Sequence, residues 1–122
     1  MSWILVVEDD ADVSSFLQYV LEGDDFKVHT AATLAEARQR LSLGLPSAII
    51  LDRGLPDGDG LDLCRELNKT PEERHLPVLV LSSRKDPEEV REGFAAGADE
   101  YIVKPFQFVN VLAQVRALTA CA

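Results

Sequence analysis

Short apolar runs alternate along the chain with stretches in which apolar residues recur at helical spacing. Residues 3–7, 48–51 and 78–81 are continuous apolar runs of strand length. In residues 13–21, by contrast, apolar side chains recur at the i, i+3, i+4, i+7 spacing that places them on one face of a helix. The pattern therefore predicts strands that alternate with helices.

Residues that begin and end helices mark the same alternation in the first half of the chain. Asp12 is expected to cap the first helix at its start and Gly23 to end it. Thr33, with Glu36 three residues later, has the form of a capping box. Residues 26–30 alternate between apolar and polar, which predicts a strand nearer the edge of a sheet.

The second half continues the alternation. Residues 54–60 are rich in glycine, proline and aspartate and predict turns, and residues 61–67 suggest a short helix. Asp86 followed by Pro87 predicts the start of the next helix. Residues 101–104 then predict a fifth strand, and residues 108–118 a last helix.

The order is therefore strand–helix, repeated five times. Strands that are apolar on both faces and separated by helices indicate a parallel sheet covered on both sides. Right-handed crossovers make a doubly wound α/β sandwich the expected fold, with residues 1–122 as one domain. In such sheets the functional site lies beyond the carboxyl ends of the strands.

Composition narrows the class of protein. The 122 residues are 47% apolar, which is typical of a globular domain, and the apolar runs are too short to cross a bilayer. No basic segment precedes an apolar stretch at the N-terminus, so we expect no signal peptide. Cys64 and Cys121 are expected to be reduced thiols of a cytoplasmic protein.

The net charge of −9 bears on partners. A surface that binds nucleic acid needs clustered lysine and arginine side chains, and the sequence has no such cluster. We therefore expect no direct binding of nucleic acid by this chain. The acidic balance also disfavours an anionic membrane surface.

Charged and hydroxyl side chains follow the predicted strands where each one ends. Glu8 and Asp9 follow the first strand, Asp52 closes the third, Ser82 closes the fourth and Lys104 closes the fifth. Carboxylates this close repel one another by roughly 4 kcal/mol per pair at 4 Å and an effective dielectric constant of about 20. Lys104 offsets part of this repulsion, and Mg²⁺, which prefers carboxylate and carbonyl oxygens, fits the remainder. An aspartate nucleophile beside a hydroxyl and an ammonium suits phosphoryl transfer.

Each of these residues also has a purely structural interpretation. The acidic run at residues 8–10 suits a helix N-terminus, and an aspartate after a strand is often a turn residue. Ser82 and Ser83 suit the start of a loop, and Lys104 suits the surface. Their joint occurrence at the ends of several strands favours a site.

The chain resembles the receiver domains of two-component response regulators over essentially its full length. The matching stretches are residues 4–10, 51–60, 80–83 and 97–106. The separations agree as well, with 30 residues from Asp52 to Ser82 and 22 from Ser82 to Lys104. The resemblance implies a flavodoxin-like (βα)5 fold with sheet order 2-1-3-4-5.

The resemblance also implies a role for each acidic residue. Asp52 would accept a phosphoryl group from a histidine kinase or a histidine phosphotransfer protein. Asp9 and Asp52 would bind Mg²⁺ directly, Glu8 would act mostly through a coordinated water, and Gly54 would offer its backbone carbonyl. The domain would promote its own phosphorylation and dephosphorylation without an external turnover substrate, so we do not expect an enzyme.

Other implied roles concern the phosphoryl group and the output. Ser82 and Lys104 would contact phosphoryl oxygens, and Ser83 would contribute its backbone N–H. Phosphorylation would draw Ser82 inward and Tyr101 into the space behind it, although Tyr101 also suits a partly buried strand position. A partner or output domain would then read the face formed by the last two helices and the strand between them, about Asp86–Leu118.

Some features leave alternatives open. Gly54 and Arg84 occupy positions that tune dephosphorylation in the family, with opposite expected effects. The last helix begins with an unusually apolar segment, residues 106–111, which packs inward or marks a face for a partner or a homodimer. Two other functions compete: a phosphorylation-independent pseudo-receiver, and a metal-dependent phosphatase. The phosphatase would need a second acid where Gly54 stands, or a cap domain to bind its substrate.

Overall fold

The computed structural model describes residues 3–68 and 76–120. Five parallel strands form its main sheet, in the order β2-β1-β3-β6-β7. Their bounds are β1 Trp3–Val7, β2 Lys27–Ala31, β3 Ala48–Asp52, β6 Val78–Ser82 and β7 Glu100–Val103. Numbered as the five strands of this sheet alone, the order is 2-1-3-4-5, so the predicted doubly wound fold is confirmed.

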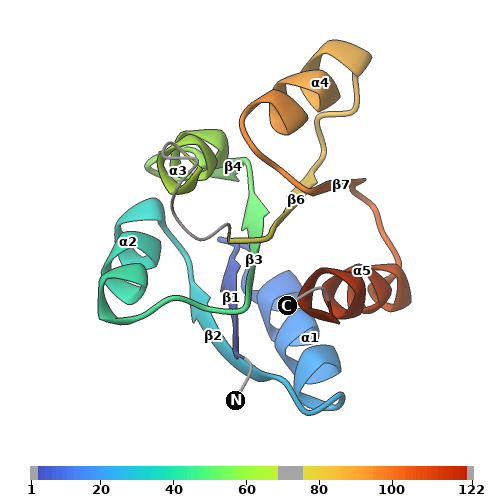
Figure 1. The fold of residues 1–122 in the computed structure, drawn as a ribbon. Helices are drawn as coiled ribbons and strands as arrows, with labels where there is room; N and C mark the ends of the chain where they lie inside the picture. Colours follow the sequence, from blue (N-terminus) through green and yellow to red (C-terminus); the bar gives the residue numbers. More distant parts are fainter. Residues whose placement is uncertain (1–2, 69–75, 121–122) are drawn as a thin grey trace.

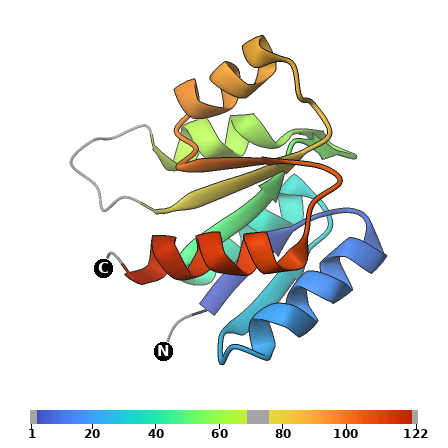
Figure 2. The same ribbon diagram turned by 90° about the vertical axis from the view of Figure 1, so that its right-hand side faces the viewer.

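Five helices cover the two faces of this sheet. Their bounds are α1 Ala11–Glu22, α2 Leu34–Leu43, α3 Gly60–Leu67, α4 Pro87–Ala95 and α5 Phe108–Ala120. α1 and α5 lie on one face, and α2, α3 and α4 lie on the other (Figures 1 and 2). Among the described residues, no helix is long and apolar enough to span a membrane.

The two-sided covering explains why the central strands are continuously apolar. Successive side chains of a strand point to opposite faces. Leu5 and Val7 of β1 therefore pack with α2 and α3, while Ile4 and Val6 pack with α1 and α5. All four side chains are fully buried, so a polar residue anywhere in this strand would enter one core or the other.

The helix starts are confirmed with one correction. Asp10, and not Asp12, caps α1, because its Oδ1 accepts the N–H groups of Asp12 and Val13 at 2.9 and 3.2 Å. Asp12 lies inside the first turn, where a negative charge favours the helix dipole. Thr33 caps α2 as predicted, with its Oγ1 accepting the N–H of Glu36.

Several element bounds differ from the sequence predictions by one or two residues, and two differences bear on the site. The turn-rich stretch contains a small antiparallel hairpin, β4 Gly54–Leu55 and β5 Gly58–Asp59. The last strand ends at Val103, one residue early, so Lys104 begins the following loop at the edge of the sheet. The Lys104–Pro105 peptide is cis. Cys64 is a buried free thiol, and Cys121 lies outside the described residues.

Candidate functional site

Three carboxylates converge at the carboxyl ends of β1 and β3. One oxygen from each of Glu8, Asp9 and Asp52 lies within 4.8 Å of the others. Glu8 and Asp52 are buried, whereas Asp9 is exposed. Parallel pairing of β1 with β3 places both strand ends at one edge, so the structure forms the acidic cluster that the sequence predicted.

Lys104 reaches this cluster from the loop after β7. Its Nζ lies 2.7 Å from Glu8 Oε1 and 3.3 Å from Asp52 Oδ2. The other oxygen of Asp52, Oδ1, accepts the backbone N–H of Gly54 at 3.2 Å. The Asp52 carboxylate is therefore held on one side by the lysine and on the other by the start of β4.

The charge state of Glu8 reflects its burial. Burial is the largest cause that raises the pKa of Glu8, to about 7; the bond from Lys104 lowers it, and the neighbouring Asp52 raises it. Burial alone would lower the pKa of Lys104, but its bonds to Glu8 and Asp52 raise it above its ordinary value. One lysine therefore does not neutralise three acids, and these hard oxygen donors fit Mg²⁺.

The predicted hydroxyls lie on the neighbouring strand. Ser82 closes β6 and is buried, and β6 pairs with β3 so that Leu81 stands opposite Asp52. The Oγ of Ser82 accepts the N–H of Arg84 at 3.0 Å, and Ser83 between them is exposed. Ser82 thus stands one residue beyond the level of Asp52, and its hydroxyl oxygen is bonded to the loop that follows.

Tyr101 lies in β7 with its ring against α4. Its hydroxyl donates to the carbonyl of Arg84 at 2.8 Å. The ring packs so closely on Gly93 that a Cβ there would lie 2.6 Å from it. Glycine at position 93 therefore permits the approach of α4 to this ring.

Arg53 follows Asp52 directly, but its sequence position alone did not predict a functional role. Its side chain is 1% exposed and forms ion pairs with Asp59 and Glu92. The available signal was a basic residue at the end of a wholly apolar strand, where a surface position is not expected. The identity of its partners depends on tertiary structure.

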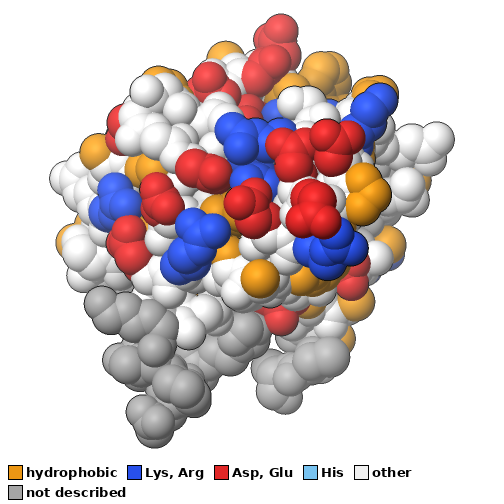
Figure 3. All heavy atoms as spheres, turned by 90° about the horizontal axis from the view of Figure 1, so that it is seen from above, with side chains coloured by type: hydrophobic (Ala, Val, Ile, Leu, Met, Phe, Trp, Pro, Cys, Tyr) orange, Lys and Arg blue, Asp and Glu red, His pale blue; other side chains and the backbone are white. Residues whose placement is uncertain are grey.

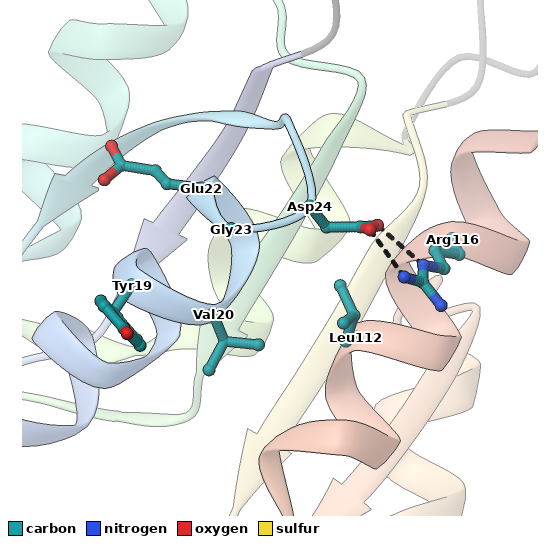
Figure 4. Close-up of a pocket in the computed structure, with 7 residues that line it drawn as sticks. All are labelled: Tyr19, Val20, Glu22, Gly23, Asp24, Leu112 and Arg116. Atoms are coloured by element: carbon teal, nitrogen blue, oxygen red, sulfur yellow. Dashed lines mark hydrogen bonds and ion pairs between the residues drawn. The ribbon is translucent and has the colours of Figure 1, made fainter.

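Two further surface features lie outside the acidic cluster. A groove between the end of α1 and α5 is crossed by the Asp24–Arg116 ion pair (Figure 4). It lies where α1 ends, whereas the acidic cluster lies where α1 begins. On the face seen from above, over α3 and α4, basic side chains lie beside acidic ones (Figure 3).

Comparisons with known proteins agree on one family. The sequence-family model of the response regulator receiver domain matches residues 4–116 of this chain. The phosphate regulon transcriptional regulatory protein PhoB of Rhizobium meliloti is 43% identical over 115 residues, which are 94% of this chain and 51% of that protein. The chain thus spans about half the length of the curated relatives it matches.

Solved structures give the same result. The receiver domain of a signal transduction histidine kinase from Syntrophus aciditrophicus has a TM-score of 0.90 and 34% identity, covering 100% of this chain and 92% of that one. The BeF3-activated receiver domain of DrrB, a protein of Thermotoga maritima, has a TM-score of 0.85 and 31% identity, covering 98% of both chains.

Proposed function

Because this chain belongs to the response regulator receiver domains, we propose that Asp52 accepts a phosphoryl group from the phosphohistidine of a histidine kinase or histidine phosphotransfer protein. The observation that carries the assignment is the place of Asp52, whose carboxylate lies between Glu8, Asp9 and Lys104. We also propose that residues 1–122 form one receiver domain that acts in the cytoplasm. Phosphorylation then controls which partner the domain binds.

Phosphoryl transfer to Asp52 forms one bond to phosphorus and breaks another. A carboxylate oxygen of Asp52 attacks phosphorus, the bond from phosphorus to the histidine nitrogen breaks, and its electron pair remains on the imidazole. Lys104, already 3.3 Å from Asp52, offsets negative charge on the incoming oxygens. The N–H of Gly54 holds the carboxylate in place during the attack.

The same residues provide the ligands for Mg²⁺. Asp9 and Asp52 would bind the ion through their carboxylates, Gly54 through its backbone carbonyl, and Glu8 through a water molecule. When bound, the ion supplies positive charge next to the phosphoryl oxygens. Three carboxylates beside a single lysine leave an excess of negative charge in the cluster, and this excess is the reason to expect the ion.

Ser82, Ser83 and Tyr101 connect this chemistry to an output. Ser82 Oγ accepts from Arg84, so its own hydroxyl proton remains available for a phosphoryl oxygen, and the N–H of Ser83 offers a second donor. Tyr101 bonds to the same loop and responds to its movement. We propose that a partner binds the face formed by α4, β7 and α5, about Asp86–Leu118.

The binding partners of this domain can differ from those of a longer protein that contains it. An output domain or a second copy of the chain suits the α4–β7–α5 face. Direct binding of nucleic acid by these residues is still not expected from their charge. The comparisons do not support that exclusion for a longer protein, because PhoB is named a transcriptional regulator and is about twice as long as the matched region.

Two other functions are less well supported. A phosphorylation-independent pseudo-receiver would be expected to lack the acceptor, an acid or the lysine, and this chain has Asp52, Asp9 and Lys104 together. A metal-dependent phosphatase would need an acid at position 54, which is glycine. The domain is therefore expected to have no turnover substrate beyond its own acyl phosphate.

Incubation with Mg²⁺ and acetyl phosphate tests the proposal. The wild-type protein should gain the mass of one phosphoryl group, and Asp52→Asn should gain none. Asp62→Asn is the matched control, because Asp62 is an exposed aspartate of α3 outside the cluster. Full phosphorylation of Asp52→Asn would refute the assignment.

A further inference from the structure

Arg53 is a buried cation that joins the acceptor strand to α4. Its Nη1 donates to the carbonyl of Glu89 at 2.9 Å, and its Nη2 donates to Glu92 Oε1 at 2.9 Å and to Asp59 Oδ2 at 3.3 Å. A buried charge is tolerated only when it is paired and hydrogen-bonded. The bonds to Glu89 and Glu92 meet that requirement, and both residues belong to α4.

The same guanidinium reaches the residue expected to switch. Arg53 Nη1 lies 3.5 Å from the hydroxyl oxygen of Tyr101, which donates in turn to the carbonyl of Arg84 at 2.8 Å. The N–H of Arg84 donates to Ser82 Oγ at 3.0 Å. A continuous series of contacts therefore runs from the residue after Asp52, through Tyr101, to the hydroxyl on the neighbouring strand.

The Nε of Arg53 differs from its two terminal nitrogens. Among the described residues, its Nε is the buried side-chain nitrogen or oxygen atom that lacks a hydrogen-bond partner. An unmet buried donor disfavours the arrangement that contains it. The bonds of Arg53 to Glu89 and Glu92 outweigh that cost in this arrangement, so the position of its side chain depends on these contacts to α4.

We propose that Arg53 is a positioning residue that couples the phosphorylation state of Asp52 to the positions of Tyr101 and α4. This inference rests on the proposed function of Asp52. Phosphorylation adds negative charge one residue from Arg53 and engages Ser82, so it acts on both ends of the series of contacts. Arg53 then carries the change to α4 through Glu89 and Glu92.

The planar shape of the guanidinium is what makes this coupling feasible. Its two terminal nitrogens bond to a backbone carbonyl and to carboxylates at the same time. A lysine ammonium is a compact point charge without this fork, and methionine provides length without charge. Arg53→Met should therefore separate phosphorylation at Asp52 from the response of Tyr101.

Fluorine NMR of protein labelled with 3-fluorotyrosine measures that response directly. The chain has two tyrosines, so Tyr19→Phe assigns the Tyr101 resonance. Beryllofluoride with Mg²⁺ serves as the phosphoryl mimic, and its binding is followed separately through its own fluorine signal. Arg91→Met is the matched control, because Arg91 is an exposed arginine of α4 that pairs with Glu88.

In the wild-type protein and in Arg91→Met, beryllofluoride should shift the Tyr101 resonance. In Arg53→Met, beryllofluoride should bind while the shift is lost. Glu92→Gln should give a smaller shift than the wild type. It carries the test if Arg53→Met fails to fold, because glutamine removes the charge of the 56% exposed Glu92 but keeps an oxygen that can accept from Arg53.

The outcomes separate the two proposals. A full wild-type shift in Arg53→Met, or in Glu92→Gln where that variant carries the test, overturns the coupling role. Binding of beryllofluoride to the wild type without a Tyr101 shift also overturns it, but leaves Asp52 as the acceptor. Failure of the wild type to bind beryllofluoride overturns both.

Discussion

Removal of one charge from the acidic cluster should stabilise the metal-free protein. Oxygens of Glu8, Asp9 and Asp52 lie at most 4.8 Å apart, which gives a repulsion of at least about 3.5 kcal/mol per pair at an effective dielectric constant of about 20. The attraction between Asp52 and Lys104 at 3.3 Å is about 5 kcal/mol on the same scale. Asp52→Asn removes two repulsions and one attraction, a net gain of about 2 kcal/mol.

Water screens the exposed Asp9, so the expected gain is about 1 kcal/mol, or a rise in Tm of roughly 3–6 °C for a domain of this size. Mg²⁺ should reverse the order of the two Tm values, so that the wild type becomes more stable than Asp52→Asn. At about 100 times its Kd, a ligand that binds only the folded state adds about 2.7 kcal/mol, and Asp52→Asn lacks one of the ligands. The wild type should therefore gain more from Mg²⁺ than the variant.

Thermal unfolding followed by circular dichroism, at about pH 8 with EDTA and again with Mg²⁺, measures both effects. Asp62→Asn controls for loss of an aspartate and should change stability by no more than about 0.5 kcal/mol, because Asp62 is exposed. A lower Tm of Asp52→Asn than of wild type in EDTA would refute the electrostatic account. An equal gain of both proteins from Mg²⁺ would refute the ligand assignment.

Three further predictions use other features. The pKa of Glu8 is raised from 4.5 to about 7 in the folded protein. In the absence of metal, the contribution of Glu8 to the free energy of unfolding is therefore greatest below about pH 4.5 and is lost as the pH rises toward 7. The Tm advantage of Glu8→Gln over wild type should therefore widen between about pH 5 and about pH 8, and a constant gap would contradict this. Gly93→Ala places a Cβ 2.6 Å from the Tyr101 ring and should cost about 1–3 kcal/mol in chemical denaturation while shifting the fluorotyrosine resonance; an unchanged resonance would show that the ring is not held there. Burial raises the pKa of the Cys64 thiol to about 11, so in a Cys121→Ala background a thiol reagent should label it only after unfolding, and rapid labelling of the native protein would contradict its burial.

The fold was predictable because its strongest signals are local. The continuous apolar run of β1 feeds two cores at once, and only a sheet covered on both faces requires that pattern. Helix starts are local as well, yet Asp10 and Asp12 both suit a cap, and only backbone geometry distinguishes them. The β4–β5 hairpin has two residues per strand, too few for a periodic signal.

The acidic site was predictable because parallel strands bring their carboxyl ends together. Glu8 and Asp52 are 44 positions apart in the chain, but each directly follows or closes a buried strand. The surroundings of Arg53 were not predictable in this way. Its partners come from β5, α4 and β7, and which of them face a given side chain depends on how α4 packs on the sheet.

Chemical mapping of the phosphorylated residue shows which aspartate accepts the phosphoryl group. Borohydride reduces an aspartyl phosphate to homoserine, which peptide mass spectrometry locates in the sequence. After treatment with acetyl phosphate and Mg²⁺, we expect homoserine at position 52 alone. Homoserine at Asp9 or another aspartate, with position 52 unmodified, would contradict it.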